Sequence, residues 1–218
     1  MKIQKHRIRV AFAVGVALLA PVGYGQNLGV IDQAVADAKA KGAKTATIPR
    51  WGTTPEPWPD TVDVFLNKYT FVLAEPVAVT VTRDQYRITT WTRLHVLETL
   101  YPQKNVAAVG IVIPESIAPP APDEVILHTD GGEMVVNGVT VRQEGGPQLK
   151  KGMEYMLVLQ LQSNGKVAVP AAGEAGVFEA EAGAQLKPIV ASNLADNLRE
   201  RGMIMVQALR IWLRHRML

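Results

Sequence analysis

Two pairs of acidic side chains have the spacing that hydrolysis or calcium binding requires. Asp130 and Glu133 flank a Gly-Gly turn, and Glu179 and Glu181 lie two residues apart near the end of an expected strand. Two neighbouring carboxylates can act as general acid and base or share a cation. Acidic residues at turns more often accept backbone N–H hydrogen bonds. We therefore expect structural roles for both pairs and keep a hydrolase built on them as an alternative.

The remaining nucleophiles and metal ligands show none of the known catalytic arrangements. The serines after the N-terminal segment are Ser116, Ser163 and Ser192, and none has the glycine-flanked setting of a nucleophile elbow. The histidines there are His95, His128 and His215, without a His-Glu-x-x-His motif. The chain has no cysteine, which excludes disulfides and thiolate metal sites. We expect no catalytic residues, metal or cofactor.

One strand face combines an aromatic ring with cationic groups. Trp91, Arg93 and His95 alternate along the expected strand over 88–97 and therefore share a side of it. Such a face could stack on a sugar or a base. We favour the alternative that it packs beneath the proline-rich segment or the C-terminal helix.

The N-terminus has the pattern of a secretory signal peptide. Residues 1–25 hold four Lys or Arg, no acidic residue, an apolar run over 10–20 and then Pro21 and small residues. The apolar run is shorter than the roughly 20 residues that a bilayer span needs. We expect cleavage near Gly25–Gln26 and a periplasmic or extracellular protein; an uncleaved anchor is the alternative. Because the lost segment carries 4 of the 23 basic and none of the 20 acidic residues, the remainder is close to −1 in charge, which argues against nucleic-acid binding.

Short strands dominate the middle of the chain. Apolar residues alternate with smaller or polar ones over 70–81 and 88–97, and Tyr155, Leu157, Leu159 and Leu161 form one face of a further strand over 155–161. Shorter apolar stretches over 109–113, 125–128, 133–136, 139–141, 167–169 and 177–178 add to them. Asn137-Gly138 and Asn164-Gly165 are hairpin turn pairs. The fold class is therefore α+β, mainly β, with a small five- or six-stranded antiparallel barrel over 60–190. We expect this domain to fold alone.

The segments on either side of this domain have helical and proline-rich patterns. Residues 26–59 should hold a helix, with apolar residues at helical spacing over 28–41, followed by a proline-rich strap. Residues 191–218 predict one amphipathic helix with five arginines and an apolar stripe that ends at Trp212. This helix could pack on its own domain, on a second copy or on an anionic membrane. We favour packing on protein.

Four stretches resemble an uncharacterised family of secreted bacterial domains that occurs in lineages such as the Acidobacteria. They are the helix and strand over 62–81, the threonine-rich strand over 88–98, the Gly131-Gly132 turn, and the segments over 147–159 and 176–178. The chain departs from the family pattern at Ala74-Glu75-Pro76 and Tyr101-Pro102. The resemblance implies an OB-like β-barrel and supplies no catalytic residues.

The sequence thus favours a non-catalytic binding or structural module of the cell envelope, without naming its task. The expected partner is an envelope protein or a glycan, and not a nucleic acid. Two alternatives stay open: a periplasmic hydrolase that uses paired carboxylates, and a peripheral membrane protein. In the second, residues 192–218 would contact a membrane surface; the same segment could also join two copies of the chain.

Overall fold

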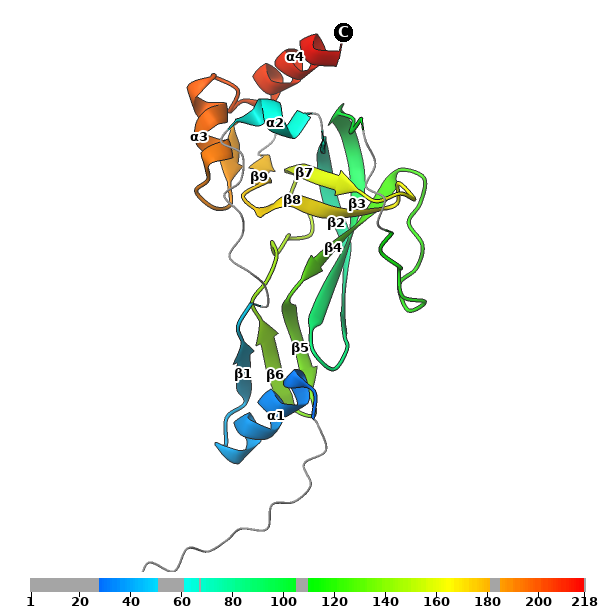
Figure 1. Ribbon diagram of the computed structural model, residues 1–218, viewed down its shortest axis with the longest axis vertical. Helices are drawn as coiled ribbons and strands as arrows, with labels where there is room; N and C mark the ends of the chain where they lie inside the picture. The colour runs from blue at the N-terminus through cyan, green and yellow to red at the C-terminus, as the bar shows by residue number, and fades with distance from the viewer. Residues whose placement is uncertain (1–27, 51–60, 67, 105–109, 181–184, 218) are drawn as a thin grey trace, which may run out of the picture.

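The computed structural model describes residues 28–50, 61–66, 68–104, 110–180 and 185–217. The predicted signal peptide and nearly all of the predicted proline-rich strap lie outside these residues. The described chain contains ten strands and four short helices, so the expected mainly β class is confirmed. Its strands form two sheets that follow one another along the long axis of the molecule (Figure 1).

The larger sheet has seven strands in the order β10-β9-β7-β2-β3-β4-β8. Their bounds are β2 Thr70–Arg83, β3 Ile88–Tyr101, β4 Glu124–Asp130, β7 Tyr155–Leu161, β8 Val167–Glu174, β9 Val177–Ala180 and β10 Leu186–Pro188. The larger sheet is not a closed barrel of the five or six strands expected from the sequence, since β9 and β10 continue it beyond β7. In addition, β8 pairs with β4 over two residues and with β7 over three. Pairing is antiparallel except between β4 and β8.

The smaller sheet has the order β1-β6-β5 and carries the N-terminal helix α1, Val30–Ala40, on one face (Figure 1). Its strands are β1 Thr45–Ile48, β5 Gly132–Val136 and β6 Val139–Gln143. Asn137 and Gly138 both have positive φ in the β5–β6 turn, as this turn pair predicts. The core between α1 and the sheet contains Ile31, Val35, Ala38, Ile48, Ile88, Val136, Val139 and Val141. The sequence predicted the helix α1 but not β1, which pairs in parallel with β6.

Glycines mark the point where the chain passes from one sheet to the other. Gly131 and Gly132, expected to form a hairpin turn, instead carry the chain out of β4 in the larger sheet and into β5 in the smaller one. Gly145 and Gly146 bring it back after β6. The expected strand over 109–113 is also wrong for its described residues 110–113, which form a loop.

The predicted C-terminal helix is two helices. Ser192 caps α3, Asn193–Glu200, by accepting a hydrogen bond from the Ala195 N–H at 3.2 Å. The chain then turns at Gly202, where φ is 68°, and resumes as α4, Val206–Met217. A glycine with positive φ ends a helix readily, which explains the break.

Both C-terminal helices pack on their own chain, beside the short helix α2, Val62–Leu66, at the end of the larger sheet (Figure 1). The two helices and the turn between them contribute Leu194, Ala195, Leu198, Met203, Leu209 and Leu213 to the largest apolar core. Four of the five arginines here contact carboxylates of the same chain. None of the helices in the described part of the chain is long and apolar enough to cross a membrane.

Candidate functional site

A cleft lies where the two sheets meet, and it consists of two recesses. The first, about 530 Å³, is bordered by β5, β6 and the glycines after β6. The second, about 340 Å³, is bordered by the end of β4, by β8 and by the loop that begins at Gly110. Arg50 and Gly146 line both recesses, so the two are adjacent at these residues.

Charged side chains from three segments line the first recess. Glu133 on β5 stands opposite Arg142 on β6 in the register of the smaller sheet. Glu144 follows β6, and Glu174 ends β8. Together with Arg50, these give three carboxylates and two guanidinium groups. The recess can therefore bind polar groups of either charge, with an excess of carboxylates.

The second recess has a different lining. Its polar members are Arg50, His128, Thr129 and Asp130, and its apolar members are Ile111, Val169 and Pro170. Asp130 lies 3.9 Å from the Arg87 guanidinium, with both side chains more than half exposed. That cation offsets the Asp130 charge, so Arg50 sets the charge of this recess.

The glycines hold the floor of the cleft in place. The Gly146 N–H donates to the Asp130 carbonyl at 2.7 Å, and the Gly131 N–H donates to the Ile88 carbonyl at 2.8 Å. A Cβ atom on Gly145 would overlap the Asp130 carbonyl group and lie 2.7 Å from the Gly131 Cα. The two crossing segments are thus close enough to exclude any side chain at Gly145, and the cleft has a fixed backbone floor.

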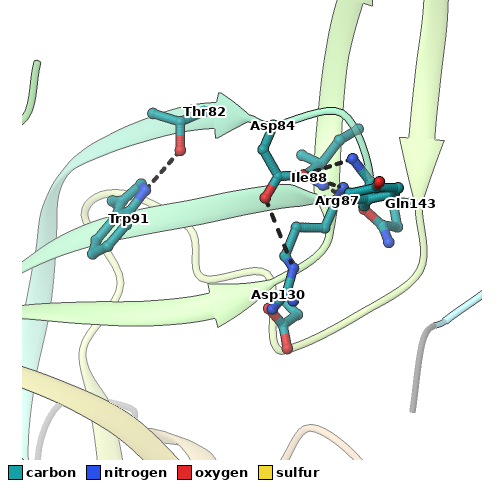
Figure 2. A network of polar contacts seen from close by, with 8 residues as sticks. Thr82, Asp84, Arg87, Ile88, Trp91, Asp130 and Gln143 are labelled. Carbon is teal, nitrogen blue, oxygen red and sulfur yellow. Dashed lines mark hydrogen bonds and ion pairs between the residues drawn. The ribbon is translucent and has the colours of Figure 1, made fainter. Parts of the chain in front are cut away.

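The tip of the β2–β3 hairpin also holds the two sheets together where the chain passes between them. In Figure 2, Arg87 lies between Asp84 and Asp130, and Gln143 reaches from β6 to Ile88. The Ile88 N–H donates to Gln143 Oε1, and Gln143 is only 4% exposed. A buried amide that accepts a backbone hydrogen bond fixes the relation between the two sheets.

The same hairpin also contacts α1. The Arg83 guanidinium donates to Asp32 Oδ1 at 2.9 Å. At the start of α1, Gly29 lies so close to Gln85 that a Cβ atom would overlap its carbonyl oxygen. The hairpin therefore joins the larger sheet to both α1 and the smaller sheet.

His128 is the titratable group that the second recess affects most. Its ring meets the Trp91 ring edge to face, with centroids 4.7 Å apart. Burial lowers the pKa of His128 from its ordinary value, against the opposing effect of Asp130, while Arg87 adds to the lowering. A neutral imidazole at the wall of the recess can both donate and accept hydrogen bonds.

The predicted aromatic and cationic face is covered. Trp91 is 5% exposed, its Nε1–H donates to Thr82 Oγ1 at 2.8 Å, and its ring packs in a cluster with Ile111, Ile113, Ile117 and Ile126. Arg93 donates to the Ala118 carbonyl, and His95 lies 3.1 Å from Asp123. Among the described residues, the loop before β4 covers Trp91, and the C-terminal helices do not; the expected proline-rich strap lies outside the described residues.

The other predicted candidates do not come together. Asp130 lines the second recess and Glu133 the first, so the turn pair is divided between them. Glu179 lies 3.8 Å from Lys187, while Glu181 is outside the described residues. Ser116, Ser163 and His215 are exposed, and Ser192 is a helix cap. Among the described residues, no group of three or more acidic or histidine side chains could hold a metal ion.

Sequence reasoning missed most residues of the cleft. Arg50, Arg142, Glu144 and Glu174 come from β1, β6 and β8 or from their ends, and no local pattern connects them. The one available signal was the repeated glycine pair, because two Gly-Gly steps 14 residues apart mark close backbone approaches. Comparisons of the chain with family models, with characterised proteins and with solved structures found no match.

Proposed function

We propose that the protein is an exported, non-catalytic binding module of the cell envelope that takes a polar ligand in the cleft between its two sheets. The observation that carries the proposal is the pair of adjacent recesses that share Arg50 and Gly146 at the junction of the two sheets. A concave site with a few convergent polar groups on a rigid floor is the usual form of a ligand site. Export rests on the signal-peptide pattern of residues 1–25.

The division of the predicted turn pair supports binding over a hydrolase built on that pair. A two-carboxylate hydrolase needs both groups on one bond of the substrate. Asp130 and Glu133 line separate recesses, and Asp130 is further engaged by Arg87. Glu133 has Arg142 as its cross-strand neighbour. These contacts suit electrostatic recognition of a ligand that is held and released unchanged.

An OB-like arrangement of the larger sheet belongs to the same proposal. Support comes from the pairing order: β2 pairs with β3, β3 with β4, β4 with β8, β8 with β7, and β7 with β2. OB folds are five-stranded, partly open barrels that present ligand sites on their strands and loops. The β5–β6 hairpin is inserted between β4 and β7 and forms one wall of the proposed site.

Equilibrium dialysis against soluble peptides and oligosaccharides released from bacterial envelopes tests the binding proposal. Mass spectrometry of the retained fraction should show ligands held by the protein and lost in an Arg50→Gln, Arg142→Gln variant. Arg214→Gln, an exposed arginine on α4 outside the cleft, is the matched control and should retain them. Equal retention by all three proteins contradicts the cleft. Conversion of a retained compound by wild type alone would show catalysis.

Membrane attachment through residues 192–218 is the rival use of the C-terminus. Arg201 and Arg216 contact Asp63 at 2.7 and 3.5 Å, and both stack on Trp212. Cations paired with carboxylates are less available to anionic lipid, which supports the cleft proposal over attachment. Flotation with anionic vesicles should leave the protein in the unbound fraction; co-flotation would favour attachment.

A further inference from the structure

The cleft separates charge along its length. The first recess, leaving aside the shared Arg50, has the carboxylates of Glu133, Glu144 and Glu174 against the single guanidinium of Arg142. The second recess has one carboxylate, Asp130, and Arg87 lies beside it. One recess therefore attracts a cation, and Arg50 at the junction attracts an anion.

Arg50 is suited to a carboxylate. It is exposed at the end of β1, and no ion pair with it occurs among the described residues. A planar guanidinium binds a carboxylate through two parallel hydrogen bonds. The position of Arg50 between the recesses places such an anion in the middle of a ligand that fills both.

The wall beyond Arg50 is apolar. Ile111, Val169 and Pro170 line the second recess beside the His128 ring. An aliphatic side chain next to the ligand carboxylate would bury its apolar surface there, which is favourable because that surface leaves water. A carboxylate and an apolar side chain attached to one carbon occur together at the C-terminal residue of a peptide.

The described lining of the two recesses contains no Trp, Tyr or Phe. Trp91, the nearest predicted sugar platform, is covered by the loop before β4. The described part of the lining thus offers charged groups and no aromatic surface, which suits a charged peptide better than a neutral glycan.

From this arrangement we infer that the cleft binds the C-terminal end of a short peptide that also carries an amino group. The terminal carboxylate binds Arg50, the apolar terminal side chain enters the second recess, and the ammonium enters the acidic first recess. This inference rests on the proposed binding function and specifies its ligand class.

Isothermal titration calorimetry with the tripeptide Lys-Ala-Leu tests it. The C-terminal amide and the form acetylated on both amines should each bind about tenfold more weakly or worse, because each loses one charge-assisted interaction. Arg50→Gln should remove the preference for acid over amide, and Glu144→Gln with Glu174→Gln should remove the preference for free amines. Arg214→Gln should keep both, and unchanged melting curves should confirm that the variants fold.

The outcomes separate the two proposals. Equal binding of the three tripeptide forms overturns the peptide inference, as does binding of the neutral trisaccharide chitotriose with no binding of Lys-Ala-Leu. In either case, a ligand retained in the dialysis experiment still supports the proposed binding function. If nothing is retained there and no tripeptide binds, both proposals fail.

Discussion

Replacing Gly145 by alanine should force apart the two chain segments that cross at the junction of the sheets. An ideal Cβ at this position would lie 2.5 Å from the Asp130 carbonyl carbon and 2.7 Å from the Gly131 Cα. Both neighbours are backbone atoms, which cannot turn aside as a flexible side chain could. The crossing segments must separate, and the hydrogen bond from the Gly146 N–H to Asp130 is strained with them.

The expected cost follows from the way proteins respond to overpacking. Inserted methylene or methyl groups in tight sites cost about 1–3 kcal/mol, and a backbone clash belongs at the upper end of that range. For a chain of this length, 1 kcal/mol lowers Tm by about 2–4 °C. Gly145→Ala should therefore lower the free energy of unfolding by about 3 kcal/mol and Tm by roughly 6–12 °C.

Gly110→Ala is the matched control. Its Cβ would meet only Ser163 Oγ, at 3.5 Å, which is ordinary contact. Thermal melts followed by circular dichroism, together with urea unfolding, compare the two variants with wild type. If Gly145→Ala unfolds within about 1 °C of Gly110→Ala, the crossing is not as tight as the structure has it, and the fixed floor of the cleft is refuted.

Three further predictions concern the rest of the molecule. A chain that ends at residue 191 should not fold. Its core loses at least five large apolar side chains worth about 1.5–3 kcal/mol each, and their sum is comparable to the total stability of a domain. A cooperative melt of that chain would contradict this prediction and restore the expectation that residues 60–190 fold alone. Glu98→Gln should lower the free energy of unfolding in urea by about 1–2 kcal/mol, because Arg210 donates to both Glu98 oxygens. The Glu98 side chain is 32% exposed and the Arg210 side chain 20%, which places the pair between the fully exposed and the fully buried cases. No loss of stability would show that water replaces the pair. Because burial lowers the folded-state pKa of His128, the unfolded state binds the proton first as pH falls. Wild type should therefore lose stability from about pH 7.5 to 5.5. His128→Phe should show a smaller loss over that range, and an identical pH slope would contradict the role assigned to His128.

Periodicity in the sequence determined the local elements of this protein. Alternation of apolar residues located β2, β3 and β7, because a strand presents successive side chains to opposite faces whatever its partners are. Helical spacing located α1, and Asn137-Gly138 located the β5–β6 turn through its need for positive φ. The cap that Ser192 provides for α3 is local in the same way, because its hydroxyl oxygen accepts from the N–H three residues later.

Partners distant in the chain were decided only by the tertiary structure. The strand β1 has four residues with one buried side chain, too short a pattern to recognise, and it exists through its parallel pairing with β6 about 95 residues away. The break between α3 and α4 depends on Gly202 and on the single apolar core that both helices cover. A stripe of apolar residues specifies which face is buried, and not whether one helix or two will bury it.

The cleft was decided wholly by the tertiary structure. Asp130 and Glu133 are neighbours in sequence, yet they line different recesses, because the chain changes sheets between them at Gly131 and Gly132. Arg50 meets Gly146 only because β1 pairs with β6. Residue types could show that each side chain is able to bind a charge, whereas the convergence of these side chains arises from long-range strand pairing, which local patterns do not encode.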